Sequence, residues 1–432
     1  MDTHLTWVSA WRDGLLMLAG AFTRPSARTF LELLTAWVLC TGRRTVTGMV
    51  RFVSAWEWRS HDVFHRLLAG AGWEMQEVWR DWALFAVGCW AATGRVPLDL
   101  DDTLFHRTGR KVEGAGWWRD AVRSTGTRVV HAWGLNLVVL TLRVRAPWGG
   151  EPLGLPINLR VHRKEGPSLL ELAQEMMQEV AGWFPEREFA LRADGFYASL
   201  AGAGLPRTEL TSRLRRDAAL YELPPARRKQ RGRPRLKGAR LPTPEGMAAR
   251  AKQWQRVKTE ERGQERERLI HTRVVLWYEV CKTRPVRLVI SRDPEGKEKD
   301  EFLVTTALDE APAQTVGGFA GRWCIEDTNR SVKQELGAEE LQTWSGAGPE
   351  RAAALGFLLY GLVWAWYLAD ARRRQRFDVP DWYLHKSHPS FRDALRALRG
   401  ALWQERIYGL SKTPSLPRKI VSLLIAALAE AA

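Results

Sequence analysis

Three acidic residues that lie far apart in the sequence have the residue types and local settings that phosphodiester chemistry requires. Asp101 falls within a run that predicts a strand, Asp194 ends a second such run, and Glu326 lies in a helical pattern. Acids at strand ends and on an adjoining helix can converge on one point despite their separation in sequence. Carboxylates without His or Cys suit two Mg²⁺ ions, with Mn²⁺ as a substitute, which clamp the attacking and leaving oxygens of a phosphodiester. Asp101, Asp194 and Glu326 are therefore the candidate catalytic and metal-binding residues.

The helical segment around Glu326 also contains cations that could hold DNA. Arg322 precedes Glu326 by four residues, and Arg330 and Lys333 follow it by four and seven. With about 100° of rotation per residue, all four side chains project from nearly one face of a helix. These cations are predicted to bind DNA phosphates beside the metal ions. The same spacing is also typical of a solvated helix face with ordinary i, i+4 ion pairs.

The run LDLDDT, residues 98–103, admits two other assignments. Asp102 is an alternative first metal ligand, because it adjoins Asp101. Asp99 and Asp101 also satisfy the D-x-D-x-T motif of haloacid-dehalogenase-like phosphatases, in which they would be nucleophile and general acid on one strand face. The later acidic pair of such enzymes is missing, since GFYAS follows Asp194 and PEGK follows Asp293. The phosphatase reading is therefore the weaker alternative.

The charge of the chain indicates a polyanionic partner. The net charge is +16 and the pI is about 10.1, and only 13 of the 65 basic residues are Lys. Arg suits phosphate oxygens and guanine edges. Residues 213–240 hold eleven Arg or Lys against two acids, and the core RGRP of this segment resembles an AT-hook. Arg231, Arg233 and Arg235 are therefore predicted to bind DNA, either in a minor groove or as a flexible basic loop that contacts phosphates.

Cysteine usage and hydropathy lead us to expect a cytoplasmic protein. Its four cysteines are widely spaced, without a C-x-x-C pair, which argues against a zinc ribbon or a disulfide framework. The N-terminus lacks the basic region of a signal peptide. The segment 352–369 holds 18 residues without a charge, which just reaches the length of a membrane span. We predict a buried helix there and no membrane partner, since no other segment suggests a membrane protein.

Apolar periodicity divides the chain into a helical start, an α/β middle and a helical end. Residues 1–90 have helical spacing, and the segment 41–56 is compatible with a helix-turn-helix or with a plain helical bundle. Strand-like runs begin at Val96 and are followed by a helix, whose start is marked by a capping box of Ser168 and Glu171. A further strand-like run follows this helix. A charged helix is expected after the basic segment. Three further strand-like runs then lead to the helix around Glu326, and the remainder is helical.

Three segments resemble one family. FAGRWCIEDTNRSVKQELG, from Phe319, resembles the Y-x2-R-x3-E-x6-K signature of a group of bacterial insertion-sequence DDE transposases. Arg322, Glu326 and Lys333 match its spacing, and Phe319 stands where the signature has Tyr. DDTLFHRTGRKVEGAG, from Asp101, resembles the first-Asp region of these enzymes, and RADGFYAS resembles the second. The three segments occur in the expected order.

The resemblance implies an α/β protein with an RNase H-like catalytic core, in which Asp101 lies on the central strand, Asp194 ends a later strand and Glu326 lies on the helix after the final core strand. It implies DNA transposition by two-metal-ion chemistry on double-stranded DNA, both terminal repeats and target. A homodimer or larger synaptic assembly, associated with the bacterial nucleoid, is expected. A catalytically silent DNA-binding derivative is the other alternative. The predicted domains are a helical DNA-binding domain (1–90), the core in two parts (91–206 and 300–346), a basic β-rich insertion (207–299) and a helical C-terminal region (347–432).

Overall fold

A large mixed sheet with helices packed against it forms the centre of the computed structural model, which describes residues 3–54, 59–225, 235–375, 377–410 and 418–430. The mixed α/β class agrees with the sequence prediction. The ten strands found in these residues are β1 (Val96–His106), β2 (Gly116–Arg119), β3 (His131–Val144), β4 (Leu153–His162), β5 (Phe189–Ala193), β6 (Thr208–Arg213), β7 (Gln255–Glu261), β8 (Gln264–Leu276), β9 (Pro285–Arg292) and β10 (Glu301–Thr305).

The sheet has the strand order β2-β3-β1-β5-β6-β10-β9-β8-β7, and β4 also pairs with β3. The strands β1, β5 and β6 run parallel, whereas the other pairs are antiparallel. β3 is buried over most of its length, because its continuous apolar run lies between β1 and β4 and beneath helices. The strand that contains Asp101, β1, therefore lies inside the sheet rather than at an edge.

Helices make up the start of the chain, as predicted: α1 (Thr3–Leu16), α2 (Arg24–Leu39), α3 (Val46–Val50), α4 (His61–Ala69) and α5 (Met75–Trp90). In the segment that is compatible with a helix-turn-helix, the described residues hold only the five-residue α3, packed against α2 and α4. Residues 55–56 at its end lie outside the described residues. The capping box of Ser168 and Glu171 is present at the start of α6 (Leu169–Trp183), as the sequence predicts.

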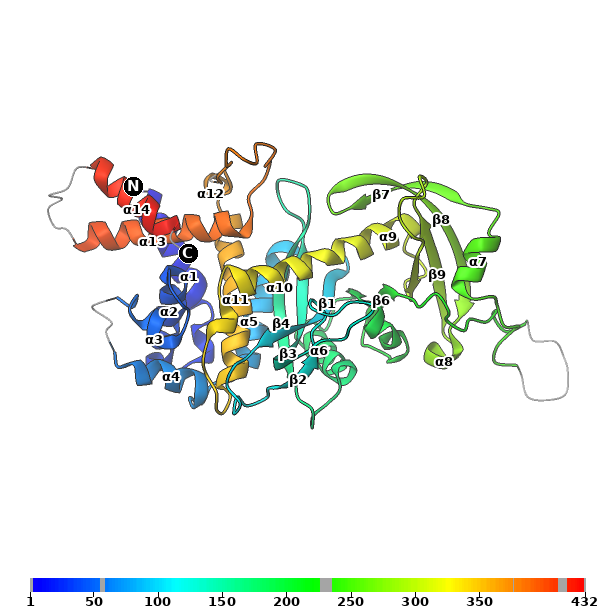
Figure 1. The fold of residues 1–432 in the computed structure, drawn as a ribbon, viewed down its shortest axis with the longest axis horizontal. Helices are drawn as coiled ribbons and strands as arrows, with labels where there is room; N and C mark the ends of the chain where they lie inside the picture. Colours follow the sequence, from blue (N-terminus) through cyan, green and yellow to red (C-terminus); the bar gives the residue numbers. More distant parts are fainter. Residues whose placement is uncertain (1–2, 55–58, 226–234, 376, 411–417, 431–432) are drawn as a thin grey trace.

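The apolar segment near residue 360 forms α11 (Gly348–Leu368), which lies between the N-terminal helices and the sheet (Figure 1). By length and composition α11 could cross a membrane, but its whole apolar window is buried inside the protein. Burial of this segment was the sequence prediction. The remaining helices are α7 (Pro244–Arg250), α8 (Tyr278–Cys281), α9 (Pro312–Ala320), α10 (Cys324–Gln334), α12 (Ala371–Arg374), α13 (Phe391–Leu410) and α14 (Arg418–Glu430), with short 3-10 turns η1 (Ala19–Ala21), η3 (Gly195–Gly202), η4 (Gly321–Trp323) and η5 (Ala338–Glu340).

Two features of the middle region differ from the sequence analysis. The short strand β6, which was not predicted, pairs with β5 and β10 inside the sheet. The expected charged helix is wrong beyond α7, because residues 255–276 form the hairpin of β7 and β8. Arg262 and Gly263 both have positive φ at its turn, the conformation that tight hairpins require. Opposite charges on the two strands also form diagonal ion pairs, as Lys258 does with Glu265.

Candidate active site

Asp101 and its neighbours occupy the middle of β1, where successive side chains point to opposite faces of the sheet. Asp99 and Asp101 face one side and Asp102 faces the other. β1 runs parallel to β5 with Leu100 opposite Ala193. The residues that follow this pair are Asp101 and Asp194, so the register brings these two acids to adjacent strands.

Asp194 follows β5 and caps the 3-10 turn η3. Its side chain accepts a hydrogen bond from the backbone N–H of Phe196 at 2.9 Å, and its backbone carbonyl accepts one from the Ser212 hydroxyl at 2.6 Å. Both bonds fix the chain where it leaves the sheet, because a cap satisfies a donor that the turn leaves open. The carboxylate of Asp194 is thereby held at the end of β5, next to β1.

Arg322 joins the acid on the strand to the acid on the helix. Its Nη1 lies 2.8 Å from Asp101 Oδ2 and its Nη2 lies 3.0 Å from Glu326 Oε1. The Arg322 side chain is 10% exposed, against 17% for Asp101 and 34% for Glu326. The planar fork of one guanidinium therefore brings together two carboxylates that are more than two hundred positions apart in the sequence.

Burial, together with neighbouring negative charge, raises the pKa values of Asp101 and Asp102. Burial raises the pKa of Asp101 to about 7; Arg322 opposes this shift, and the charges of Asp194 and Asp102 add to it. Burial likewise raises the pKa of Asp102 to about 6. A hydrogen bond from Tyr197 opposes this shift, and the charge of Asp194 adds to it. Because burial and neighbouring acids make the ionised carboxylates less stable, a bound cation would stabilise this site.

Asp102 has a different setting from Asp101. Its Oδ1 accepts a hydrogen bond of 3.1 Å from the hydroxyl of Tyr197, which is buried in η3. Asp101, in contrast, shares its cation with Glu326. Of the two candidate first ligands, Asp101 is thus the one that the structure connects to the helical acid.

Asp99 lies in the protein interior and is fully buried. Arg143 of β3 donates to it in a two-pronged ion pair, in which Nε lies 2.9 Å from Oδ2, and the thiol of Cys324 lies 3.3 Å from the same oxygen. A carboxylate that is enclosed and paired in this way is not accessible to a phosphate ester. The geometry therefore argues against the phosphatase alternative, which needs Asp99 as nucleophile.

The residues of this site fit a hard divalent cation in donor type. Within the described ranges, no three His, Cys, Asp or Glu side chains are gathered into a metal-holding group. Asp101 and Glu326 nevertheless direct oxygens at one shared cation, the Arg322 guanidinium, and the charge of Asp194 acts on Asp101. All three donors are carboxylate oxygens, which Mg²⁺ and Mn²⁺ prefer. For all three acids to hold a metal ion, Arg322 must withdraw from between two of them.

The predicted DNA-binding cations of the helix have separate settings. Arg322 is bound to the two acids, although its buried Nε has no hydrogen-bond partner. Arg330 is exposed and pairs with Asp327 at 2.7 Å. Lys333 lies over the ring of Phe105, and burial lowers its pKa. The four side chains predicted on one helix face are therefore not all at the acidic site.

The basic segment is described only in part. Arg235 is exposed, whereas Arg231 and Arg233 lie outside the described residues. The prediction that these three residues bind DNA is accordingly one for experiment.

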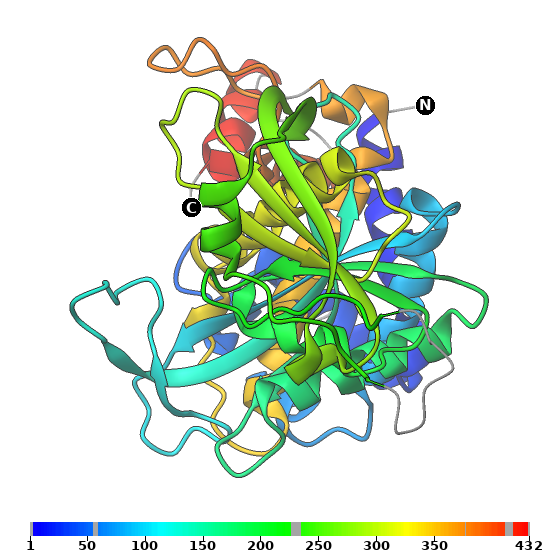
Figure 2. The same ribbon diagram turned by 90° about the vertical axis from the view of Figure 1, so that its right-hand side faces the viewer.

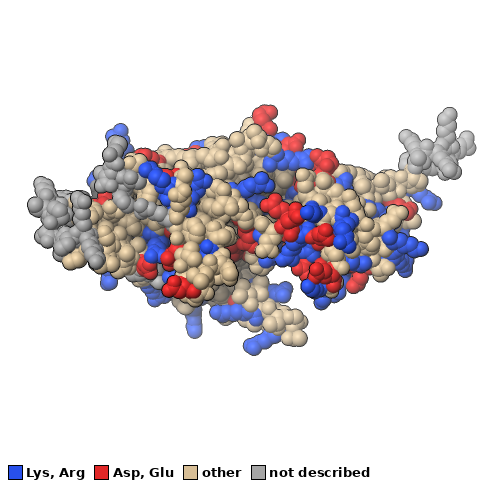
Figure 3. Space-filling model, turned by 90° about the horizontal axis from the view of Figure 1, so that it is seen from above, with Lys and Arg blue, Asp and Glu red and all other residues tan. Residues whose placement is uncertain are grey.

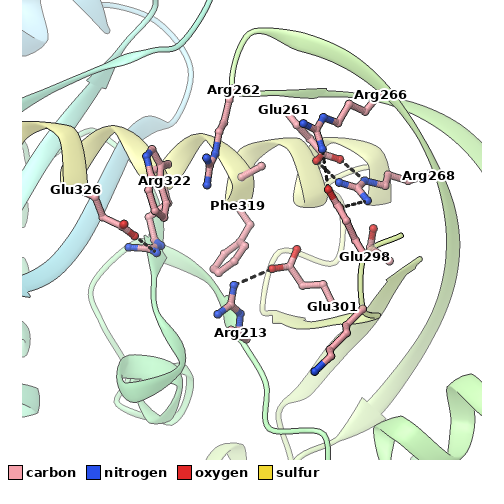
Figure 4. Close-up of a pocket in the computed structure, with 14 residues that line it drawn as sticks. Arg213, Glu261, Arg262, Arg266, Arg268, Glu298, Glu301, Phe319, Arg322 and Glu326 are labelled. Carbon is pink, nitrogen blue, oxygen red and sulfur yellow. Dashed lines mark hydrogen bonds and ion pairs between the residues drawn. The ribbon is translucent and has the colours of Figure 1, made fainter. Parts of the chain in front are cut away.

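A cavity of about 400 Å³ opens beside Glu326, between α10 and the hairpin of β7 and β8 (Figure 4). Charged side chains dominate its lining, which comprises Arg213, Glu261, Arg262, Arg266, Ser291, Arg268, Glu298, Lys299, Glu301, Phe319, Ala320, Arg322, Trp323 and Glu326. One wall is a network in which Arg268 bonds both Glu261 and Glu298.

At this cavity the hairpin turn reaches over η4, which directly precedes α10. The Arg262 guanidinium lies 4.0 Å from the centre of the Trp323 ring, and no described acid forms an ion pair with it. A side chain added at Gly263 would meet backbone atoms of Gly150, in the turn between β3 and β4, at 2.1 Å. The hairpin turn therefore packs against the loop between β3 and β4. It also places the cation of Arg262 over Trp323, which precedes Glu326 by three residues.

Sequence reasoning did not identify Arg143, Tyr197 or Arg262 as residues of the site. Arg143 ends the apolar run of β3, and an Arg at such a position is a signal that a buried acid needs a partner. Tyr197 lies just after Asp194 in the family-like segment RADGFYAS. Nothing in the local sequence connects Arg262 with Glu326, because only the hairpin geometry brings them together.

Comparison with known proteins identifies one family. The model of the family described as DDE superfamily endonuclease matches residues 17–284, a range that includes Asp101 and Asp194 and ends before Glu326. No curated protein matches. Among solved structures, a cryo-EM structure of a piggyBac transposase synaptic complex with hairpin DNA matches with a TM-score of 0.40 and 10% sequence identity, over 94% of this chain and 76% of that one.

Proposed function

Since this chain belongs to the DDE superfamily endonuclease family, we propose that it is a DNA transposase, which cuts the ends of a mobile element and joins them to target DNA. The observation that carries the proposal is the meeting of Asp101 and Glu326 on one guanidinium, with Asp194 on the strand next to Asp101. We infer that the core is RNase H-like, because Asp101 lies on an internal strand, Asp194 follows a parallel neighbour and Glu326 lies on a helix after β10.

In this proposal Asp101, Asp194 and Glu326 would hold two Mg²⁺ ions, or Mn²⁺ in their place. When bound, such ions supply the positive charge that favours an attacking oxygen and stabilises a leaving one. The chain itself supplies the carboxylates and a surrounding that keeps them poorly solvated, as the raised pKa values of Asp101 and Asp102 indicate. The metal preference is testable by direct binding measurements.

Arg322 has two functions in this account. Without DNA it pairs with Asp101 and Glu326 and so reduces their mutual repulsion. Its Nε donor is buried and unsatisfied, which is costly unless a ligand oxygen completes the hydrogen bonding. A phosphate of bound DNA is such a ligand. Arg262 at the rim of the cavity provides a second cation for the same DNA strand.

The test is a cleavage assay on DNA that carries the element ends, with and without Mg²⁺. The substitution Glu326→Gln removes the charge and keeps the shape, so cleavage should fall by at least about a hundredfold while DNA binding remains. Asp327→Asn is the matched control, because Asp327 adjoins Glu326 on α10 and, among the described residues, forms an ion pair only with the exposed Arg330. The control protein should cut DNA normally. Cleavage by the Glu326→Gln protein at the normal rate would refute the proposal.

The catalytically silent alternative makes a distinct prediction in the same assay. A DNA-binding derivative of a transposase would bind the element ends and leave them intact in every form of the protein. The proposal also includes two double-stranded DNA partners, the terminal repeats and the target. It further includes a homodimer or a larger assembly. They are accessible to binding assays and to measurements of mass in solution.

A further inference from the structure

Residues 107–131, here called the basic arm, project from the body of the protein. The arm leaves the end of β1, contains β2 and returns as β3. In Figure 2 it is the cyan extension at the left, and in Figure 3 the same part projects from the lower edge and shows blue and tan atoms. No step of the catalytic account uses it.

Cations cover the arm. Its exposed charged residues are Arg110, Lys111, Glu113, Arg119, Arg123 and Arg128. Arg123 lies 3.4 Å from the buried Asp120, whereas the other four cations form no ion pair with any described residue. Unpaired cations that project into solvent together raise the local potential, and this cost is recovered when a polyanion binds.

A groove at the base of the arm extends this charged surface. The groove has a volume of about 550 Å³, and its lining includes Arg43 of the N-terminal region together with Arg110 and Lys111. Trp344 is 61% exposed at the same place. Cations from two separate segments of the chain, Arg43 and the base of the arm, therefore line one concave surface, which also contains Glu339 and Glu340.

The root of the arm is fixed to the catalytic strand. The buried Asp120 accepts hydrogen bonds from the backbone N–H groups of Val122 and Arg123 and pairs with His106 at 2.8 Å. His106 is the last residue of β1, the strand that contains Asp101. A ligand held by the arm would thus have a defined position relative to the catalytic acids.

We propose that the basic arm and the groove at its base bind backbone phosphates of duplex DNA outside the catalytic centre. The inference rests on the proposed function only in requiring a DNA substrate. Charge favours DNA over a second copy of the chain, because two such arms would repel each other. The apolar atoms of Val122, which is 90% exposed, would then lie against the sugars of the DNA backbone.

The experiment measures binding of a fluorescent duplex of about 30 base pairs by the full-length Glu326→Gln protein at several salt concentrations. Each phosphate contact adds about 0.9 to the slope of log K against log salt. Replacing Arg110, Lys111, Arg119 and Arg128 by Ala should therefore reduce this slope by up to about 3.6 and weaken binding at least about tenfold. Thermal unfolding of the variant should be unchanged, because all four side chains are exposed.

A matched control removes four exposed cations at the far end of the sheet, Arg256, Lys258, Lys282 and Arg284. The control protein loses the same charge and should retain the slope of the parent. An unchanged slope in the arm variant, or an equal loss in the control, would overturn the proposal. So would a change in the mass of the protein in solution with DNA binding intact, since that result assigns the arm to a second copy. Absence of duplex binding in the parent itself would instead count against the proposed function.

Discussion

Arg322 connects the acids of the candidate active site. Its replacement should therefore change metal binding and DNA cleavage in opposite directions. Arg322 pairs with Asp101 and Glu326, which hold its pKa above the usual value although burial opposes the charge. Without Arg322 the two carboxylates repel each other across a partly buried space, so they should bind a divalent cation more tightly in the absence of DNA. We expect Arg322→Gln to increase Mn²⁺ affinity about tenfold by calorimetry and to impair DNA cleavage. Weaker Mn²⁺ binding by this variant would show that Arg322 supports the metal site.

The raised pKa of Asp101 predicts how metal binding varies with pH. A carboxyl group whose pKa is about 7 in the folded protein must lose a proton before it can ligate a metal ion. Mn²⁺ affinity should therefore fall about tenfold per pH unit below pH 7. The same shift makes ionisation of Asp101 destabilising, since its pKa rises on folding. Stability without metal should accordingly decline as the pH rises from about 4 through 7. Affinity that is constant from pH 5 to pH 8 would contradict this account.

The buried pair of Asp99 and Arg143 should stabilise the region beneath the catalytic strand. Arg143 also donates to the backbone carbonyl of Gly318 in α9, so the pair ties that helix to β1 and β3. Asp99→Asn leaves an unbalanced charge in the interior and should cost about 3 to 5 kcal/mol in urea denaturation. Glu267→Gln, which removes an exposed partner of Arg256, should cost less than about 1 kcal/mol. Equal losses for the two variants would exclude a structural function for the buried pair.

Sequence alone was sufficient to propose the acids of the candidate site, because their residue types and the order of their motifs are local signals. The partners of these acids depend on tertiary register. Asp99 meets Arg143 only because β1 and β3 pair antiparallel with Asp99 opposite Thr141. Arg262 meets Trp323 only through the position of a hairpin turn. Neither relation leaves a pattern in one stretch of sequence.

Among the elements, the hairpin of β7 and β8 yields a test with a closely matched control. Gly263→Ala introduces a methyl group at a positive φ and against the backbone of Gly150, so the turn must move away from the catalytic helix. Gly296 has a similar φ of 70° and open space around it, so Gly296→Ala carries the backbone cost of about 1 kcal/mol without the clash. Gly263→Ala should reduce DNA cleavage about tenfold or more, whereas Gly296→Ala should retain it. Equal activity of the two proteins would remove the hairpin from the account.

The elements that were predicted correctly are those with long periodic patterns, such as β3, α6 and α11. β6 escaped notice because its six residues, TELTSR, are mostly polar and gain their burial from β5 and β10 on either side. The charged hairpin was expected to be a helix because charge composition alone does not distinguish the two. The alternation of side chains between the two faces of each strand can be recognised only once the turn at Arg262 and Gly263 is known.

At the scale of the whole molecule, the helices of residues 1–90 are packed against later parts of the chain. The indole N–H of Trp82 donates to the carbonyl of Pro156 at 2.7 Å, and that of Trp37 donates to the carbonyl of Leu336 at 2.8 Å. Both tryptophans are buried by these contacts. We therefore expect residues 1–90 alone to lack a cooperative unfolding transition in circular dichroism, while the full chain has one. A cooperative transition of the isolated segment would establish it as an independent domain.

The central claim is that three distant acids meet around one metal centre, and cleavage of the polypeptide by bound Fe²⁺ tests it most directly. Fe²⁺ substituted for Mg²⁺, with ascorbate and peroxide, cuts the chain close to the metal ion. The account predicts fragments from three sites, near Asp101, Asp194 and Glu326, and their joint loss on addition of excess Mg²⁺. Cleavage near the two aspartates with none near Glu326 would contradict it.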